Sequence, residues 1–437
     1  MKRYSNLFFA DPMPSASVRP PLIFPSDIRV PAASKETAPN GVALYMLPAD
    51  GFEVLRVTFV FRAGSAVQQV PFSASTTANL LAEGTQRYAA HEIAEQLDFY
   101  GSWFDVNLDR DYVYVNFAML SKFFRETLAV AEEILLRPVF PEEELQTYCA
   151  KRKQRLAIDR QKVDVQAREA FGAALFGPQH PYGVASDEEL YDRLTRKDIE
   201  RFYRTFYTAE NGFVVCSGRI GEQERQAVAA IAAQLPHGAV AQPHFPALQT
   251  VFDTHVAHAG AVQSSIRIGR LLFPRQHPDF VGMQVVATVL GGYFGSRLMQ
   301  NLRERHGYTY GVVAAMVNFD RAGYLAIATQ VGSEATEAAL AEIYAEIERL
   351  RREPMSDDEL SLVKNIMAGE MMRILDGPFG IADVTIENIL CGADNSIIDA
   401  NLRAIRAMTP DDVQRLAQQY LKREDLVTVV AGAIENS

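Results

Sequence analysis

The feature that most constrains the fold of this chain is an internal repeat. Residues 195–199 (TRKDI) match residues 409–413 (TPDDV), and Gly218 in a buried strand pattern matches Gly432, both pairs lying 214 positions apart. Residues 141–145 and 356–360 match as well, one residue out of step. An offset shared by several elements predicts two lobes of similar structure.

Each half combines strand patterns with amphipathic helix patterns, which predicts an α+β fold. We expect two homologous lobes, each a mainly antiparallel sheet with helices packed on one face. The 437 residues suffice for two or three cores. Composition places the boundaries, and the expected units are an extended, proline-rich arm at 1–40, an N-terminal lobe at 41–235, a linker at 236–248 and a C-terminal lobe at 249–437.

Within the first half, residues 42–47 and 54–61 have strand composition, and the turn sequence PADG between them predicts a hairpin. A second hairpin is expected between Trp103 and Phe117. Helical spacing of apolar residues predicts helices over 73–82 and over about 141–176.

The second half contains a glycine-rich stretch, residues 290–298, with the sequence LGGYFGSRL. Gly291, Gly292 and Gly295 predict a flexible loop with few side chains, where the backbone can approach a ligand closely. Ser296 is a good N-cap residue, so we expect a short helix to begin there.

Gly307 is expected to end this helix and a strand to follow it. Arg303 would then lie near the helix end and Tyr310 early in the strand. A guanidinium and a phenol held in this way can bind and polarise a carbonyl group. On spacing alone, a surface arginine and a packed tyrosine are the commoner outcome.

The run Leu302-Arg303-Glu304, followed by Gly307 and Tyr310, resembles the Arg/Tyr signature of the insulinase–pitrilysin (M16) peptidases, in their bacterial processing-peptidase-like branch. The preceding glycine-rich stretch is similar to that branch too, and the resemblance covers about residues 40–437. It implies that Arg303 and Tyr310 contact substrate and assist the tetrahedral transition state. In that family they do so across a cavity from a zinc site on another domain.

The resemblance also locates the zinc helix, where active members carry His-x-x-Glu-His shortly before Gly-Thr. Counting back from Gly84 and Thr85 places Ser75, Ala78 and Asn79 at the His, Glu and His positions. These side chains offer no imidazole and no carboxylate, so the expected zinc pair and general base are missing. The third ligand should lie near residues 149–156, a basic run. We therefore expect no metal in this chain.

Other histidines and carboxylates give no better metal site. His255 and His258 lie in a predicted strand, where a spacing of three puts side chains on opposite faces. The alternating Asp and Asn residues of 105–111 lack the Gly and the terminal Glu of a calcium loop.

The net charge of −11 argues against a nucleic-acid or anionic-membrane surface. It is compatible with basic peptides as ligands and equally with a simple contribution to solubility. Three widely separated cysteines make a disulfide framework unexpected. No stretch has the roughly 18 apolar residues of a membrane span. We expect a cytoplasmic location, with the periplasm left open if a leader precedes this start.

Two functions remain open at this point. The first is a non-catalytic subunit of a heterodimeric zinc peptidase, inactive alone, which binds peptide or unfolded polypeptide and supplies Arg303 and Tyr310 in trans. Zinc would then lie in a homologous partner subunit. The alternative is a non-proteolytic structural or peptide-binding protein, like the respiratory-complex core proteins that resemble this family. Hydrolysis by this chain alone has no supporting constellation.

Overall fold

The computed structural model describes residues 24–25, 27–185 and 187–433. Most of the predicted arm, residues 1–23 and 26, lies outside this part of the chain. Of the remainder, Ser34–Thr37 forms strand β1, which pairs with the strand β2 at Ala43–Pro48. Asn395 donates a hydrogen bond to the Pro31 carbonyl at 2.8 Å, so the described end of the arm lies against the other half of the chain.

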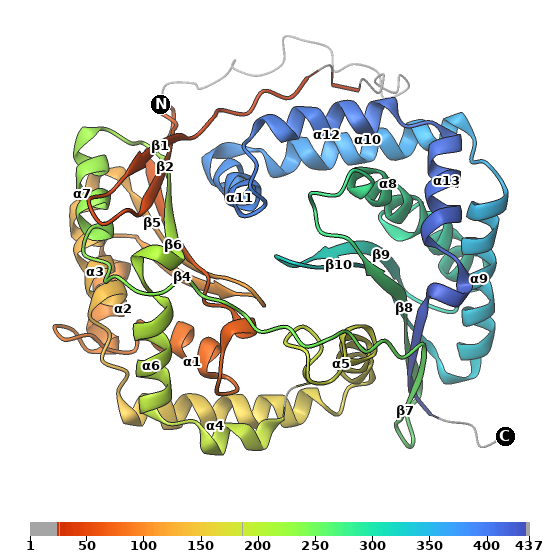
Figure 1. Cartoon of the computed structure of the whole chain (residues 1–437), viewed down its shortest axis with the longest axis horizontal. Coiled ribbons are helices and arrows are strands. Elements are labelled where there is room, and N and C mark those ends of the chain that lie inside the picture. Colours follow the sequence, from red (N-terminus) through yellow and green to blue (C-terminus); the bar gives the residue numbers. More distant parts are fainter. Residues whose placement is uncertain (1–23, 26, 186, 434–437) are drawn as a thin grey trace, which may run out of the picture.

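The first lobe is a six-stranded sheet in the order β1-β2-β6-β3-β5-β4, with helices on its outer face (Figure 1). Its other strands are β2 Ala43–Pro48, β3 Val54–Phe61, β4 Trp103–Leu108, β5 Val113–Leu120 and β6 Gly212–Gly218. Its helices are α1 Ser73–Leu80, α2 Ala90–Phe99, α3 Phe124–Leu136, α4 Glu142–Asp159, α5 Val163–Phe176, α6 Arg196–Phe206 and α7 Glu222–Ala232.

The second lobe is a five-stranded sheet in the order β7-β11-β8-β10-β9. Its strands are β7 Asp253–Ala257, β8 Gln263–Leu272, β9 Val312–Asn318, β10 Gly323–Gly332 and β11 Val427–Gly432. Its helices are α8 Phe280–Gly291, a π-helix Met299–Arg305, α9 Thr336–Arg352, α10 Asp357–Ile374, α11 Gly377–Leu390, α12 Ser396–Ala407 and α13 Pro410–Tyr420.

Apart from the additional edge strand β1, the two sheets have the same strand order, which confirms the predicted α+β fold of paired lobes. In each, one pair is parallel, β2 with β6 and β7 with β11, and the other pairs are antiparallel. The repeated TRKDI and TPDDV segments begin α6 and α13. Thr195 and Thr409 cap these helices in the same way, each accepting a hydrogen bond from the backbone N–H three residues later.

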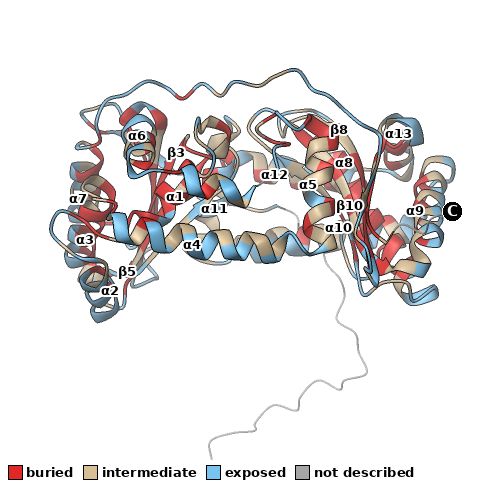
Figure 2. Cartoon of the chain, turned by 90° about the horizontal axis from the view of Figure 1, so that it is seen from below, coloured by how far each residue is buried: buried red, intermediate tan, exposed pale blue. Residues whose placement is uncertain are grey.

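Each lobe sends one helix to the sheet of the other lobe (Figures 1 and 2). Helix α5 belongs to the first half but packs on β8 and β11, whereas α11 belongs to the second half and packs on β6 and β2. Both helices have 14 residues. Phe171 and Phe176 of α5 share a buried cluster with Val429, and Ile386 of α11 shares one with Val60. This exchange holds the lobes together by hydrophobic burial.

Polar contacts join the lobes at the tips of two hairpins. The phenol of Tyr112 donates to Asp320 at 2.6 Å, and Arg62 forms an ion pair with the same carboxylate at 3.2 Å. Asp111 accepts from the Tyr182 phenol at 2.6 Å and from the Asp320 backbone N–H at 2.8 Å. The β4–β5 turn is therefore fixed against the β9–β10 turn.

Two of the predicted elements were wrong in detail. The strands expected as a hairpin over 42–47 and 54–61 are not neighbours, because β6 lies between them. The helix expected over 141–176 is two helices, broken at residues 160–162. Neither Pro nor Gly marks this break. It redirects the chain so that α5 reaches the second sheet. The hairpin between Trp103 and Phe117 is confirmed as β4 and β5.

A membrane-spanning helix is also absent from the described residues, since none there is both long and apolar enough.

Candidate functional site

The glycine-rich stretch joins the buried end of α8 to the π-helix. Gly291 is the last residue of α8, where a Cβ would lie 2.5 Å from the backbone nitrogen of Ala314 in β9. This glycine therefore serves close packing of the helix on the strand. Gly292 and Gly295 are in the loop that follows and line two different cavities, of about 450 and 500 Å³ respectively.

The short helix expected after this loop is present, but Ser296 does not cap it through its side chain. Its hydroxyl is buried without a hydrogen-bond partner among the described residues, although its carbonyl accepts from the Gln300 N–H at 2.9 Å. The helix is a π-helix over Met299–Arg305. Such turns are rare and frequently occur at functional sites.

Buried ion pairs and hydrogen bonds anchor the base of the π-helix. Arg297, whose side chain is 10% exposed, binds Glu359 through two hydrogen bonds of 2.8 Å. Asn301 donates to Glu342 at 2.8 Å and to the buried Glu346 at 2.9 Å. These contacts tie the segment to α9 and α10 and fix the backbone from which Arg303 projects.

Arg303 lies in the last turn of the π-helix with its side chain 36% exposed. Its guanidinium lies 4.6 Å from the ring centroid of Phe294, a loop side chain that is itself exposed. It also approaches Glu304 at 3.4 Å. The ring orients the guanidinium while leaving its N–H donors accessible to a ligand.

Tyr310 is 93% exposed and precedes β9, so it is in the turn and not in the strand as expected. Gly307, with φ of 65°, ends the helix as predicted. The Thr309 hydroxyl fixes the turn by donating to the Gly311 carbonyl at 2.9 Å and accepting from its N–H at 3.1 Å. The backbone is thus ordered, and the phenol itself points into solvent.

Arg303 precedes the turn that contains Tyr310, and the two side chains make no hydrogen bond with each other. Neither residue lines the two cavities beside the loop. The proposal that they meet at a shared substrate carbonyl stays a prediction. The commoner outcome for this spacing is a surface arginine and a packed tyrosine. Arg303 is partly exposed, in partial agreement, whereas Tyr310 is not packed.

The three positions at which the resemblance predicts a degenerate zinc motif lie on α1 and have different environments. Ala78 is buried at 1% exposure, whereas Asn79 is exposed and donates to the Ser75 carbonyl at 2.7 Å. The Ser75 hydroxyl donates to the Phe72 carbonyl at 3.2 Å. Neither the apolar Ala78 nor the two neutral side chains provides the anionic or imidazole ligand that zinc prefers. Throughout the described chain, three or more His, Cys, Asp or Glu residues do not gather in a group suited to a metal.

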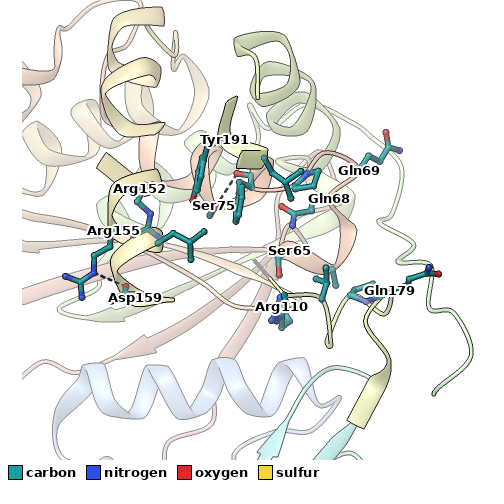
Figure 3. A pocket seen from close by; sticks show the side chains of 18 residues that line it. Ser65, Gln68, Gln69, Ser75, Arg110, Arg152, Arg155, Asp159, Gln179 and Tyr191 are labelled. Carbon is teal, nitrogen blue, oxygen red and sulfur yellow. Dashed lines mark hydrogen bonds and ion pairs between the residues drawn. The ribbon is translucent and has the colours of Figure 1, made fainter. Parts of the chain in front are cut away.

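Ser75 faces a cavity of about 440 Å³ between α1, α4 and the loop that precedes α6 (Figure 3). Arginine, glutamine and apolar side chains dominate its lining. The residues are Ser65, Ala66, Gln68, Gln69, Pro71, Phe72, Ser75, Arg110, Arg152, Arg155, Leu156, Asp159, Gln179, Pro181, Val184, Ala185, Leu190 and Tyr191. The place where the resemblance implied a metal is therefore a cationic, partly apolar hollow.

The predicted basic character of residues 149–156 explains one wall of this cavity, because Arg152 and Arg155 both come from α4. Arg110 comes from the distant β4–β5 turn, and no local signal associates it with α4. Phe294 and Arg297 were likewise not singled out as site residues, although both belong to the glycine-rich stretch. The glutamates at 142–144 lie in the first turn of α4, where their negative charge suits the helix dipole.

Comparison with known proteins supports the family resemblance. Residues 193–367 match the family model described as the peptidase M16 inactive domain. A protein named as an uncharacterized zinc protease in Streptomyces coelicolor is 23% identical over 80% of this chain and 79% of its own length. Another so named, in Bacillus subtilis, is 20% identical over 80% of this chain and 85% of its own.

Solved structures share the fold. A peptidase M16 inactive domain from Pseudomonas fluorescens has a TM-score of 0.83 at 23% identity, over 92% of this chain and 98% of that one. A chain of Complex III2 from Candida albicans has a TM-score of 0.74 at 16% identity, over 92% and 96% respectively. The resemblance inferred from the motifs is thereby confirmed.

Proposed function

We propose that this chain, whose resemblance to the M16 peptidase family is confirmed, is the non-catalytic subunit of a heterodimeric zinc peptidase. It would bind peptide and supply Arg303 and Tyr310 to the active site of a homologous partner, which would carry the zinc. The same proposal places the complex in the cytoplasm, or in the periplasm if a leader precedes this start.

The observation that carries the proposal is the exposure of Tyr310. A phenol that is 93% exposed makes little contribution to the core of its own lobe. It nevertheless projects from a turn held by hydrogen bonds, in the segment that follows the π-helix bearing Arg303. Both groups are hydrogen-bond donors suited to a peptide carbonyl and to the oxyanion that develops from it.

The chemistry of α1 supports the division of labour between subunits. Ser75, Ala78 and Asn79 offer neither a general base nor zinc ligands. When bound in the partner, zinc would activate water and polarise the scissile carbonyl. The residues of this chain would bind, orient and stabilise developing charge, tasks that require no metal of their own.

The test is a peptidase assay with a zinc-bearing chain of the same family that co-purifies with this one. Arg303→Ala or Tyr310→Phe should lower kcat/KM by about 10²–10³-fold, the loss typical of one oxyanion donor. Size-exclusion chromatography should show the complex still assembled. Arg305→Ala and Tyr308→Phe are matched controls within the same turn and should leave the rate unchanged. Full activity of the first two variants would reject the role in trans.

A second candidate is a non-proteolytic structural or peptide-binding protein. The similarity to a chain of Complex III2 favours it, because that chain has a similar fold and is part of a complex. Peptide binding without any rate increase in the presence of a zinc-bearing relative would support this candidate over the first.

A further inference from the structure

The cavity beside Ser75 has a surplus of positive charge. Three guanidinium groups line it, from Arg110, Arg152 and Arg155, against the single carboxylate of Asp159. Arg155 forms an ion pair with Asp159 at 2.9 Å, and Lys162 approaches the same carboxylate at 2.7 Å. Asp159 is therefore already paired with two cations, neither of which is Arg110 or Arg152.

Arg110 and Arg152 have no carboxylate partner within 4 Å among the described residues. The guanidinium of Arg152 lies 5.8 Å from the ring centroid of Tyr148, so its main neighbour is aromatic. Burial lowers the pKa of Arg110, an effect that Tyr324, Glu169 and Asp111 offset in part and that Arg168 reinforces. An anion that binds beside a desolvated guanidinium without a close acidic partner stabilises its buried positive charge.

The rest of the cavity is largely apolar. Phe72 stacks on Tyr191 with ring centroids 4.0 Å apart, and Leu156, Val184 and Leu190 add aliphatic surface. In Figure 3, Arg152 and Arg155 lie on one side of the hollow and Arg110 lies below it. A volume of about 440 Å³ is in the usual range for small-molecule sites. The lining suits a ligand with one anionic group and an apolar body.

We propose that this cavity binds a carboxylate attached to an apolar body, and that the C-terminal residue of a bound peptide is its source. The proposal rests on the peptide binding of the proposed function and adds which end of the peptide is held. Planar guanidinium groups match a carboxylate through paired N–H donors. The α-carboxylate would lie between Arg110 and Arg152, with the side chain against Phe72 and Leu156.

A phosphate ligand fits this cavity less well. Asp159 would repel a dianion, and the apolar surface would remain without a partner. Phosphate sites in proteins typically use backbone N–H groups at a helix N-terminus, whereas here the cations are side chains. Inorganic phosphate should therefore compete only weakly.

The test measures fluorescence polarisation of a labelled hexapeptide that ends in leucine, as the free acid and as the C-terminal amide. The full chain should bind the acid at least about tenfold more tightly than the amide, as expected for a charge-assisted hydrogen bond. Arg110→Gln and Arg152→Gln should each remove about tenfold of that preference and leave the affinity for the amide unchanged. Arg204→Gln, on the exposed face of α6, is the matched control.

N-acetyl-leucine and inorganic phosphate, added as competitors, identify the source of the anion. Displacement by N-acetyl-leucine alone supports carboxylate recognition. If N-acetyl-leucine binds and the peptide does not, the carboxylate chemistry stands and a free organic acid replaces the peptide as its source. If phosphate competes as strongly as N-acetyl-leucine, the proposal is overturned.

Equal affinity for acid and amide overturns this inference but leaves the proposed function standing. Failure of both peptides and of N-acetyl-leucine to bind overturns the inference and removes peptide binding as well. Arg152 lies on an exposed surface of α4, so its variant decides the matter even if Arg110→Gln fails to fold.

Discussion

The helices α1 and α8 occupy equivalent places in the two lobes and have opposite characters. In both lobes this helix follows a central strand of the sheet and precedes the edge strand. Helix α1 has the sequence SASTTANL and borders a cavity lined by arginines. Helix α8 has the sequence FVGMQVVATVLG and is mostly buried in the core of its lobe. Both copies of the repeat border a cavity, but the one beside α8, of about 450 Å³, is lined mainly by apolar side chains.

The helices that follow also differ, although they match in length. Both α4 and α10 have 18 residues and three acidic residues in the first turn. In α10, Glu359 binds the buried Arg297 and anchors the π-helix. Its counterpart in α4 is Glu144, which forms no ion pair with the described residues. The pKa of Glu83 is raised by burial and, secondly, by Glu144. The carboxylate at this position of the repeat therefore anchors a neighbouring segment in the second lobe only.

The largest expected effect comes from removing this anchor. Glu359→Gln leaves the guanidinium of Arg297 buried without its partner and should lower the free energy of unfolding by about 3 kcal/mol or more. Glu144→Gln is the matched control in the other lobe and should change it by less than about 0.5 kcal/mol. Urea unfolding followed by circular dichroism measures both. Equal losses would mean that the two carboxylates play equivalent roles.

Two glycine substitutions within the glycine-rich stretch should also differ in their cost to stability, by a smaller amount. Gly291→Ala should cost about 1–3 kcal/mol of stability, because its Cβ would meet the backbone of β9 and neither element can move freely. Gly295→Ala meets only the ring of Tyr293 at 3.0 Å, which can rotate away, so the cost should be well below that. Thermal unfolding of the two variants tests this, and a larger loss for Gly295→Ala would contradict the packing role given to Gly291.

The smallest losses of stability should be equal in the two lobes, because α6 and α13 begin with the same capping box. Thr195→Ala and Thr409→Ala should each cost about 1 kcal/mol. Hydrogen bonds from the two threonine hydroxyls, reinforced by backbone N–H groups, lower the pKa of Asp198 and of Asp412.

A lowered carboxylate pKa fixes the pH range in which these caps contribute. The stabilisation is fully present above the unfolded value, close to 3.8, and is lost as pH falls through the folded value. The two threonine variants should therefore lose less stability relative to the unchanged chain at pH 3 than at pH 7. Urea unfolding at both pH values checks this, and a cost that is independent of pH would show that the carboxylates do not act through the caps.

Much of the fold follows from local signals in the sequence. The capping residues Thr195 and Thr409 mark helix starts because their side chains act on the adjacent backbone alone. Gly307 ends the π-helix segment because only glycine adopts positive φ readily. By contrast, the failure of Ser296 as a side-chain cap accompanies the burial of its hydroxyl, and that burial is set by packing.

The sequence by itself determined that this chain has two repeated α+β halves and that α1 cannot supply a zinc pair, because both conclusions depend on residue type and spacing. Only the tertiary structure decided that α5 and α11 exchange sheets, that β6 separates β2 from β3, and that Arg110 joins α4 around a cavity. These features depend on which apolar surfaces meet over long separations in the chain, and no local pattern encodes that choice.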